Sequence, residues 1–406
     1  MHVPVFAAIL ILGACSAQDN GRDSNAARTG PPVEQAPPHT DFAPAFAGQT
    51  RAPEARSEIA IAVEEIAVGL EHPWAVEVLP DGAVLVTERP GRLRVITLDG
   101  SVSAPVAGLP AVDARGQGGL LDVALSPDFA RDQLIYWTFA EARDGGNGTS
   151  AARGRLNRAA NRVEDVQVIF RQAPAWQSRG HFGSRIVFDG AGRLYVAMGD
   201  RQQREPRELA QDLSTHIGKV VRIDPDGSAP RDNPFAGREG ARAEIWSYGH
   251  RNIQGAALHP RTGELWLVEH GPQGGDELNI ARAGRNYGWP VISYGQEYNG
   301  APVNGGVAVR EGMEQPLYYW DPVIAPGGML FYRGDLFPWR GDILIAGLYT
   351  RALVRLELDG ERVAGEERLI AGRHGRVRDI AETADGAVMI VTDEDNGRLL
   401  RLTPAR

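Results

Sequence analysis

The chain has 406 residues, enough for two or three average domains or for one large repetitive fold. Its 49 glycines and 27 prolines favour many short strands joined by tight turns over long helices. The net charge of -9 leaves no basic stripe of the kind that nucleic-acid-binding proteins carry, so we expect no nucleic-acid partner.

The N-terminal residues have the pattern of an export signal. Residues 3–12 form an apolar run that is too short to cross a bilayer but typical of a signal-peptide core. The run ends in Leu-Gly-Ala-Cys15, which resembles a bacterial lipobox; the alternative is a plain secretory signal with a chance cysteine. We predict a lipoprotein-type signal peptide at residues 1–14 and lipidation of Cys15. Ser16 then implies a periplasmic protein anchored to the outer membrane, with no other membrane contact.

Residues 15–57 are rich in proline, alanine, glycine and charge, and have few large apolar side chains. Such a segment cannot bury a core of its own. We therefore expect a flexible tether at residues 15–57, followed by one folded domain at residues 58–406. Cys15 is the only cysteine in the sequence, which excludes an intramolecular disulfide and a cysteine-based metal site.

A strand–turn–strand unit recurs along the folded domain. Its six copies lie at residues 74–88, 120–141, 184–200, 255–271, 328–348 and 378–394. A third strand follows most copies. Repetition of this kind predicts an all-β fold, a six-bladed β-propeller of four-stranded antiparallel blades, with residues 61–67 completing the last blade. A large β-sandwich would leave the six copies unexplained.

The residues before the first strand of each unit should meet at one mouth of the central channel, because the first strand of a blade is innermost. Polar side chains gather at these positions: Gln117, His181, Arg251, Asn252, Arg376 and Arg378. Arginines can hold the carboxylates of a ligand, and a neutral histidine can take a proton from a hydroxyl. Asp200 is expected beside His181, where it would fix the tautomer. The alternative is that these groups only satisfy the sheet ends.

The loop at residues 268–290 is rich in glycine and in oxygen ligands, and includes the run Gly-Pro-Gln-Gly-Gly-Asp-Glu at 271–277. Glycines let backbone carbonyls turn inward, and Ca²⁺ prefers carbonyl and carboxylate oxygens. The composition therefore suggests a Ca²⁺ site, with a solvated connecting loop as the alternative. The acidic turn at residues 393–396 is interpreted as a solvated hairpin turn.

Several common cofactor and catalytic motifs are absent from the sequence. It has no G-x-G-x-x-G after a strand, P-loop, H-E-x-x-H, G-x-S-x-G or C-x-x-C. These absences argue against a nicotinamide or flavin dehydrogenase of the Rossmann type.

The motifs resemble those of the soluble sugar dehydrogenases that use pyrroloquinoline quinone (PQQ), the aldose sugar and glucose dehydrogenase family. The matching pieces are HPWAVEVLPDG, GQGGLLDVALSPDF, HFGSRIVFDGAGRLYVAMGD, WSYGHRN, EHGPQGGDELN, NYGWP and RVRDI. The resemblance implies a six-bladed propeller that oxidises aldoses to lactones with PQQ and Ca²⁺, and an unidentified electron acceptor. Sorbosone or another aldehyde as substrate, or a non-catalytic ligand-binding propeller, are the alternatives.

The resemblance also assigns roles to individual residues. His181 matches the base that deprotonates the anomeric hydroxyl while hydride passes to the quinone, Asp200 orients it, and Arg251 stabilises charge on the reacting oxygens. Gln117, Asn252, Arg376 and Arg378 match residues of the PQQ site.

The metal ligands follow in the same way. The carbonyls of Gly271 and Pro272 match ligands of the Ca²⁺ that polarises PQQ, while Glu277 and Tyr287 match ligands of a second, structural Ca²⁺. In members of the family, the segment that follows the strand ending here at Leu348 usually contains a lysine that contacts PQQ. Here Arg351 is taken as its replacement.

Overall fold

The structure of the protein, a computed structural model, describes residues 30–405. It is built almost wholly of β-strands, with short helices such as α1 (Phe129–Asp132) and α2 (Arg204–Glu208) in its loops. Across these residues no helix combines the length and apolar character needed to cross a membrane. The predicted signal peptide at residues 1–14 and the predicted lipidation site Cys15 lie outside the described residues.

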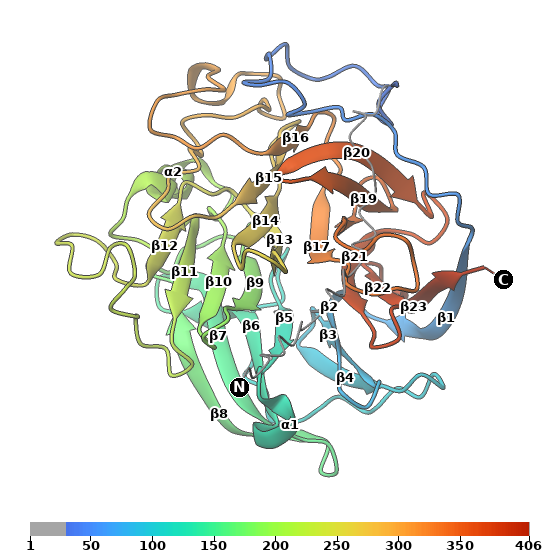
Figure 1. Ribbon diagram of the computed structural model, residues 1–406. Coiled ribbons are helices and arrows are strands. Elements are labelled where there is room, and N and C mark those ends of the chain that lie inside the picture. Colours follow the sequence, from blue (N-terminus) through green and yellow to red (C-terminus); the bar gives the residue numbers. More distant parts are fainter. Residues whose placement is uncertain (1–29, 406) are drawn as a thin grey trace, which may run out of the picture.

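Six antiparallel sheets surround a central axis as the blades of a propeller (Figure 1). The innermost strands are β2 (Pro73–Val78), β5 (Leu120–Leu125), β9 (Gly183–Phe188), β13 (Ile253–Leu258), β17 (Pro326–Phe331) and β21 (Val377–Glu382). The second strands are β3 (Val84–Glu88), β6 (Leu134–Arg143), β10 (Leu194–Met198), β14 (Leu265–Glu269), β18 (Ile343–Gly347) and β22 (Val388–Thr392). The predicted fold is confirmed.

The outer half of each blade follows in the same order. The third strands are β4 (Arg92–Ile96), β7 (Gly146–Asn157), β11 (Lys219–Ile223), β15 (Asp276–Ile280), β19 (Ala352–Asp359) and β23 (Gly397–Pro404). The fourth strands are β8 (Arg162–Arg171), β12 (Ile245–Tyr248), β16 (Tyr318–Trp320), β20 (Arg362–Leu369) and β1 (Ile61–Leu70). In the blade of β2, irregular chain takes the fourth position, because Ser103 and Val106 donate backbone hydrogen bonds to β4.

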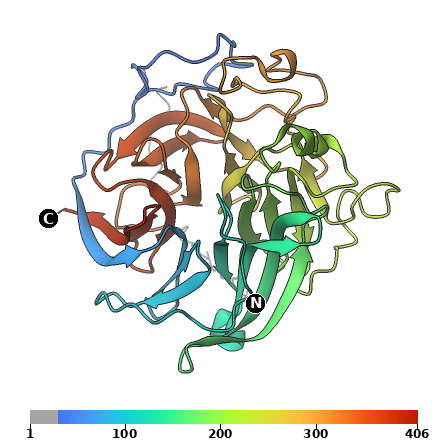
Figure 2. The ribbon, with the colours of Figure 1, turned by 180° about the vertical axis from the view of Figure 1, so that it is seen from behind.

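The ring is closed by a sheet that combines both ends of the described chain. Strand β1 pairs antiparallel with β23, with Val63 opposite Leu402 and Ile61 opposite Pro404. Figure 2, seen from behind, shows these two strands side by side next to the C-terminus. The predicted completion of the last blade by residues 61–67 is confirmed, and β1 extends it to Leu70.

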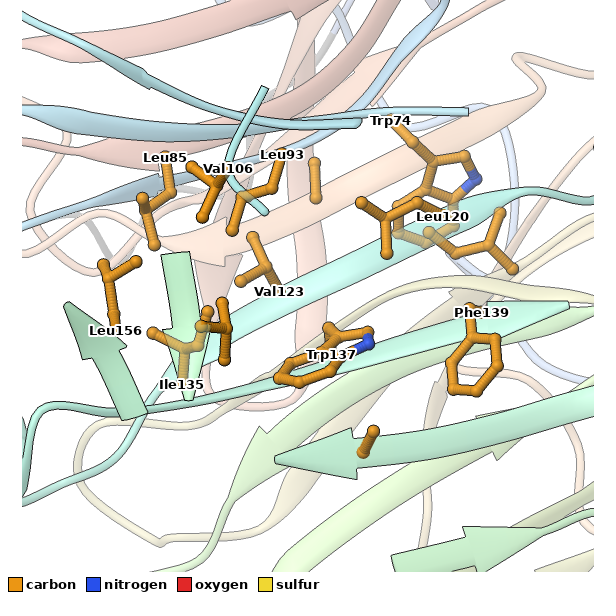
Figure 3. Close-up of a cluster of buried hydrophobic side chains, with 14 of the residues drawn as sticks. Trp74, Leu85, Leu93, Val106, Leu120, Val123, Ile135, Trp137, Phe139 and Leu156 are labelled. Carbon is orange, nitrogen blue, oxygen red and sulfur yellow. The ribbon is translucent and has the colours of Figure 1, made fainter. Parts of the chain in front are cut away.

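Apolar side chains fill the space between neighbouring blades. In the cluster between the blades of β2 and β5, Trp74, Leu120 and Trp137 are almost fully buried (Figure 3). Similar clusters lie at the other five blade junctions. Strands such as β10 and β22 are buried at every position because they face a neighbouring blade on each side, which explains their nearly continuous apolar sequences.

The expectation of a flexible tether is wrong for residues 30–57, which pack on the outer edge of the propeller. Ala55 and Gln49 have no exposed surface. The Gln49 side chain donates to the Pro316 carbonyl at 2.9 Å, and the buried carboxylate of Asp321 accepts hydrogen bonds from the His39 and Thr40 backbone. A segment too polar to form its own core can still bury small side chains against an existing one, which composition alone does not reveal.

The direction of the innermost strands defines two mouths of the central channel. The residues at their starts line a cavity of about 120 Å³, and those at their ends line a wider cavity of about 890 Å³. Between the two cavities, Arg185 forms ion pairs with Asp122 at 2.8 Å and Asp379 at 3.1 Å. We refer to the cavity at the strand starts as the entry cavity.

Candidate active site

His181 and Asp200 form a buried pair at the entry side of the channel. His181 lies two residues before β9, and Asp200 lies two residues after β10, the antiparallel neighbour of β9. The distance from His181 Nδ1 to Asp200 Oδ1 is 2.6 Å, and both side chains are almost fully buried. A carboxylate at Nδ1 holds the hydrogen there, so the unprotonated Nε2 is the proton acceptor. The expected pairing is confirmed.

The backbone around His181 is held in an uncommon conformation. Its φ is +48°, in the left-handed region, and its N–H donates to the Gln117 side chain at 2.8 Å. The Arg201 guanidinium donates to the His181 carbonyl at 3.2 Å and lies over the Phe182 ring, with Cζ 3.7 Å from its centroid. A Cβ at Gly199 would lie 2.2 Å from the same carbonyl, so glycine is required there.

The charges around the pair keep His181 neutral and Asp200 ionised. Burial lowers the pKa of His181 below its usual value; the Asp200 carboxylate opposes this effect, and Arg251 adds to it. Burial alone would raise the pKa of Asp200, but His181, Arg251 and the Gln202 N–H outweigh it and lower the pKa. The pair therefore combines a neutral imidazole with a carboxylate at neutral pH.

Arg251 links the pair to the glycine-rich loop. It lies between β12 and β13, and its carbonyl accepts the Asp200 N–H at 2.8 Å. One guanidinium nitrogen donates to the carbonyls of His270 at 2.9 Å and Gly271 at 2.6 Å. The buried Nε has no hydrogen-bond partner within residues 30–405, which leaves a donor for a bound ligand.

The entry cavity brings together most of the residues predicted to bind a cofactor. Its lining includes Gln117, Asn252, Arg376 and Arg378. The buried Arg378 side chain stacks on Trp74, with Cζ 4.2 Å from the ring centroid, and donates to Gln254 at 2.7 Å. Burial lowers the pKa of Arg378 to about 9, so an anion in the cavity would relieve a real electrostatic cost.

Two sequence interpretations differ from the structure at this cavity. Asp393, interpreted as part of a solvated turn, lines the cavity and accepts a hydrogen bond from His72 at 2.9 Å. Burial alone would raise the pKa of Asp393, but Arg378 and His72 lower it. Arg351, taken as the PQQ contact, is an exposed turn residue with φ +50° and is absent from the cavity lining, which contains Leu348 instead.

Sequence reasoning missed several further residues that line the entry cavity or hold Asp200. Trp74, Arg89, Gln254 and His270 line the entry cavity, and Trp289 donates to Asp200. His270 stood in the quoted motif EHGPQGGDELN, next to Gly271, and Gln254 lies two residues after Asn252, so proximity to the motif residues was the available signal. Trp74 and Trp289 stood in the quoted motifs HPWAVEVLPDG and NYGWP, but no role was assigned to them, because an aromatic residue in a propeller is usually core.

A buried carboxylate organises the predicted Ca²⁺ loop. Asp276, at the start of β15, accepts the Gly271 N–H at 2.8 Å and the N–H groups of Ile324 and Ala325 at 2.9 and 2.7 Å. These bonds hold the loop in place, and its residues Gly271 and Pro272 border a small cavity together with Glu269 and Glu277. Burial raises the pKa of Asp276 to about 7.

The two residues predicted for the second Ca²⁺ site lie on the same small cavity. Burial, together with the neighbouring Glu269, raises the pKa of Glu277 to about 8. The Tyr287 hydroxyl donates to the Ile280 carbonyl and its ring stacks on His250, so only its backbone carbonyl is available as a ligand. Among residues 30–405 no group of three or more His, Cys, Asp or Glu side chains is arranged around a metal position, so backbone oxygens would have to complete the ligand set.

Comparison with known families decides the classification. A model described as Glucose / Sorbosone dehydrogenase matches residues 70–401. The chain belongs to the glucose/sorbosone dehydrogenase family. The family resemblance stated from the motifs is thereby confirmed, and it covers the whole ring from the end of β1 to β23.

Relatives of this glucose/sorbosone dehydrogenase family member carry related names. The aldose sugar dehydrogenase YliI of Escherichia coli is 44% identical over 347 residues, covering 84% of this chain and 92% of that protein. The quinoprotein glucose dehydrogenase B of Acinetobacter calcoaceticus is 28% identical, covering 81% and 84%. The PQQ-bound structure of an aldose sugar dehydrogenase from Streptomyces coelicolor has a TM-score of 0.69 and 27% identity, covering 85% and 99%.

Proposed function

We propose that this protein oxidises aldose sugars at the anomeric carbon to lactones, using PQQ and Ca²⁺, with His181 as the general base. The observation that carries the proposal is the buried His181–Asp200 pair directly beside an arginine-lined cavity. Its similarity to named aldose sugar dehydrogenases, one with PQQ bound, supports the choice of substrate and cofactor.

The entry cavity has the donor set that a flat, polyanionic quinone needs. Arg376 and Arg378 supply positive charge, the buried Nε of Arg378 lacks a partner among the described residues, and Trp74 provides an aromatic wall. Guanidinium groups bind carboxylates through paired hydrogen bonds. When bound, PQQ would supply the electron-accepting centre that the side chains lack.

The chain's own residues perform the proton transfer. His181 Nε2 takes the proton of the anomeric hydroxyl, since Asp200 holds the hydrogen on Nδ1 and burial keeps the ring neutral. Asp200 stabilises the imidazolium that forms. Arg251 faces the same space and stabilises negative charge as it develops on the reacting oxygen. The anomeric C–H bond breaks with loss of a hydride, which the electron-accepting centre supplied by PQQ would take up, and the lactone leaves. The two electrons then go to an acceptor that we leave unidentified.

A reconstitution assay tests the function. Protein supplied with PQQ and Ca²⁺ is expected to reduce an artificial dye with a panel of aldoses, and gluconolactone is expected as the product from glucose. Protein without PQQ serves as the control. Dye reduction with sorbosone or simple aldehydes but no aldose would favour the alternative substrate, and PQQ binding without turnover on any of these would favour a non-catalytic propeller.

The Glu277 region fits a divalent cation. A second carboxylate, Glu269, lies close to Glu277 in a buried setting, and Gly271 and Pro272 border the same cavity. A Ca²⁺ ion would hold Glu277 in the ionised form and connect the loop to the ring.

Glu277→Gln is expected to abolish most of the stabilisation that Ca²⁺ gives. With Ca²⁺ at about 100 times its Kd, the wild type should gain about 2.7 kcal/mol of unfolding free energy, because the ion binds the folded state only. Denaturant unfolding with and without Ca²⁺ measures the gain. Glu264→Gln, on an exposed carboxylate paired with Arg282, is the matched control and should keep it. An equal gain in both variants would contradict the assignment.

We also propose that the chain is exported to the periplasm and held at the outer membrane by a lipid on Cys15. The support is the apolar run and the Leu-Gly-Ala-Cys sequence. Metabolic labelling with a fatty-acid analogue, compared between the wild type and Cys15→Ala, tests the anchor.

A further inference from the structure

Trp289 contacts two members of the proposed catalytic group at once. Its indole Nε1 donates to Asp200 Oδ2 at 2.7 Å, on the carboxylate oxygen opposite the one that His181 uses. The face of the same indole lies under Arg251, whose Cζ is 5.2 Å from the ring centroid. We propose that Trp289 is a positioning residue, which fixes Asp200 through its edge and Arg251 through its face. The inference rests on the proposed sugar oxidation.

The hydrogen bonds of Asp200 show what the indole adds. Oδ1 accepts from His181 Nδ1 at 2.6 Å and from the Gln202 N–H at 2.7 Å, whereas Trp289 is the partner of Oδ2. Two bonds to one oxygen leave the carboxylate plane free to rotate about the Cβ–Cγ bond. A third bond on the other oxygen fixes the plane, and with it the direction in which the imidazole points.

The indole is itself held rigidly. Trp289 is 6% exposed, its backbone N–H donates to the Gly249 carbonyl at 2.9 Å, and its backbone carbonyl accepts from the Gln211 side chain at 2.8 Å. Its ring packs against Ala210 and Val303. An indole N–H is a donor only, and the acceptor that it has found here is a buried carboxylate.

The loop that carries Trp289 also carries Tyr287, and both border the small cavity with Glu277. Asp200 follows a strand of the neighbouring blade. The indole therefore joins the predicted Ca²⁺ region to the catalytic pair across a blade junction. Through this indole, the loop that carries the predicted Ca²⁺ ligands also acts on the orientation of the catalytic base.

Trp289→Phe removes the N–H and keeps an aromatic ring. We expect kcat of the reconstituted enzyme to fall about tenfold or more, with KM and PQQ affinity unchanged within about twofold, because a misdirected base affects the reaction more than binding. The matched control is Trp246→Phe. Trp246 donates to the Ala281 carbonyl at 2.7 Å and lies under Arg222 at 4.6 Å, so it has the same two kinds of contact away from the site.

A titration of His181 distinguishes positioning from packing and needs no turnover. The charged groups that act on His181 are Asp200, Arg251 and Arg201. His270 is a further titratable side chain near His181. A carboxylate that loses a donor becomes a stronger acceptor and favours the imidazolium, so Trp289→Phe should raise the pKa of His181. NMR titration of ring-labelled histidine in the full mature chain measures it, with His181→Ala assigning the signal. Trp246→Phe should leave the pKa unchanged.

The outcomes separate this inference from the proposed function. If the wild type oxidises no sugar, the function fails, while the titration still tests Trp289. An unchanged His181 pKa and kcat in Trp289→Phe, or equal changes in Trp246→Phe, would overturn the inference. If Trp289→Phe does not fold, the indole N–H signals in the NMR spectrum of the wild type provide the test instead. The Trp289 signal is assigned as the one that moves in Asp200→Asn, and it should also move with pH as His181 titrates. A Trp289 signal that does not respond to that titration overturns the inference.

Discussion

His181→Ala is expected to lower kcat by about 10²–10⁴-fold while PQQ binding stays within about twofold of the wild type. The reason is that the ring contributes proton transfer, whereas the cavity that holds the cofactor is lined by other side chains such as Arg376 and Arg378. Stopped-flow dye reduction measures the rate, and fluorescence titration of the apoprotein measures PQQ affinity.

The matched control for this variant is His374→Ala. His374 is partly exposed in the turn before β21, and its side chain has no part in the proposed chemistry. Its kcat should equal that of the wild type. Turnover of His181→Ala within threefold of the wild type would disprove the base assignment, and a parallel loss of PQQ affinity would show that His181 acts mainly in binding.

Arg185→Met is expected to lower the unfolding free energy by about 3–5 kcal/mol, because it leaves two carboxylates in the channel without their partner. Arg185 pairs with Asp122 and Asp379, and all three side chains are buried. It also donates to the Gln254 carbonyl at 2.9 Å, which sits at the floor of the entry cavity. Equilibrium unfolding in urea measures the loss.

The loss in Arg185→Met should be larger at pH 8 than at pH 5. Burial already raises the pKa of Asp122 to about 6 and that of its neighbour Glu77 to about 8. Above about pH 4, a carboxyl whose pKa is raised in the folded protein keeps a proton that the unfolded chain has released. The unfolding free energy therefore falls as the pH rises through the pKa of that carboxyl in the folded protein.

Arg193→Met is the control for this second variant. Arg193 also contacts two carboxylates, Asp224 and Asp232, but in a partly exposed setting, where ion pairs contribute about 0–1 kcal/mol. A loss below about 1 kcal/mol in Arg185→Met, or one equal to that of Arg193→Met, would contradict the role of the channel ion pairs.

The sequence allowed the fold and the centre of the site to be predicted because both follow from repetition. Each innermost strand starts at the same mouth, so Gln117, Asn252 and Arg378 could be placed together from their positions in the repeat. The antiparallel pairing of β9 and β10 then placed Asp200 beside His181. These inferences needed only strand order and direction.

Contacts between different blades were not accessible in the same way. Trp289 and Asp200 are separated by 89 positions, and their hydrogen bond depends on the path of an irregular loop. Asp393 was predicted to be solvent-exposed because acidic turns usually are solvent-exposed. In the structure, His72 and Arg376 from other segments lie close to its carboxylate. The docking of residues 30–57 depends on backbone bridges from Thr50 to Tyr319 in β16 and from Glu54 to Glu366 in β20, which their own composition does not encode.

The pairing of β1 with β23 has a consequence for the order in which the protein is completed during synthesis. The sheet of the last blade contains residues from both ends of the described chain, and its inner strand carries Arg378. Chains are made from the N-terminus, so five blades are available before β23 emerges, whereas β1 has to wait for it. A chain that stops short of β23 therefore contains the residues that line the entry cavity, Arg378 and Asp393 included, but it leaves β1 and β22 without the strand that joins them, so its ring stays open.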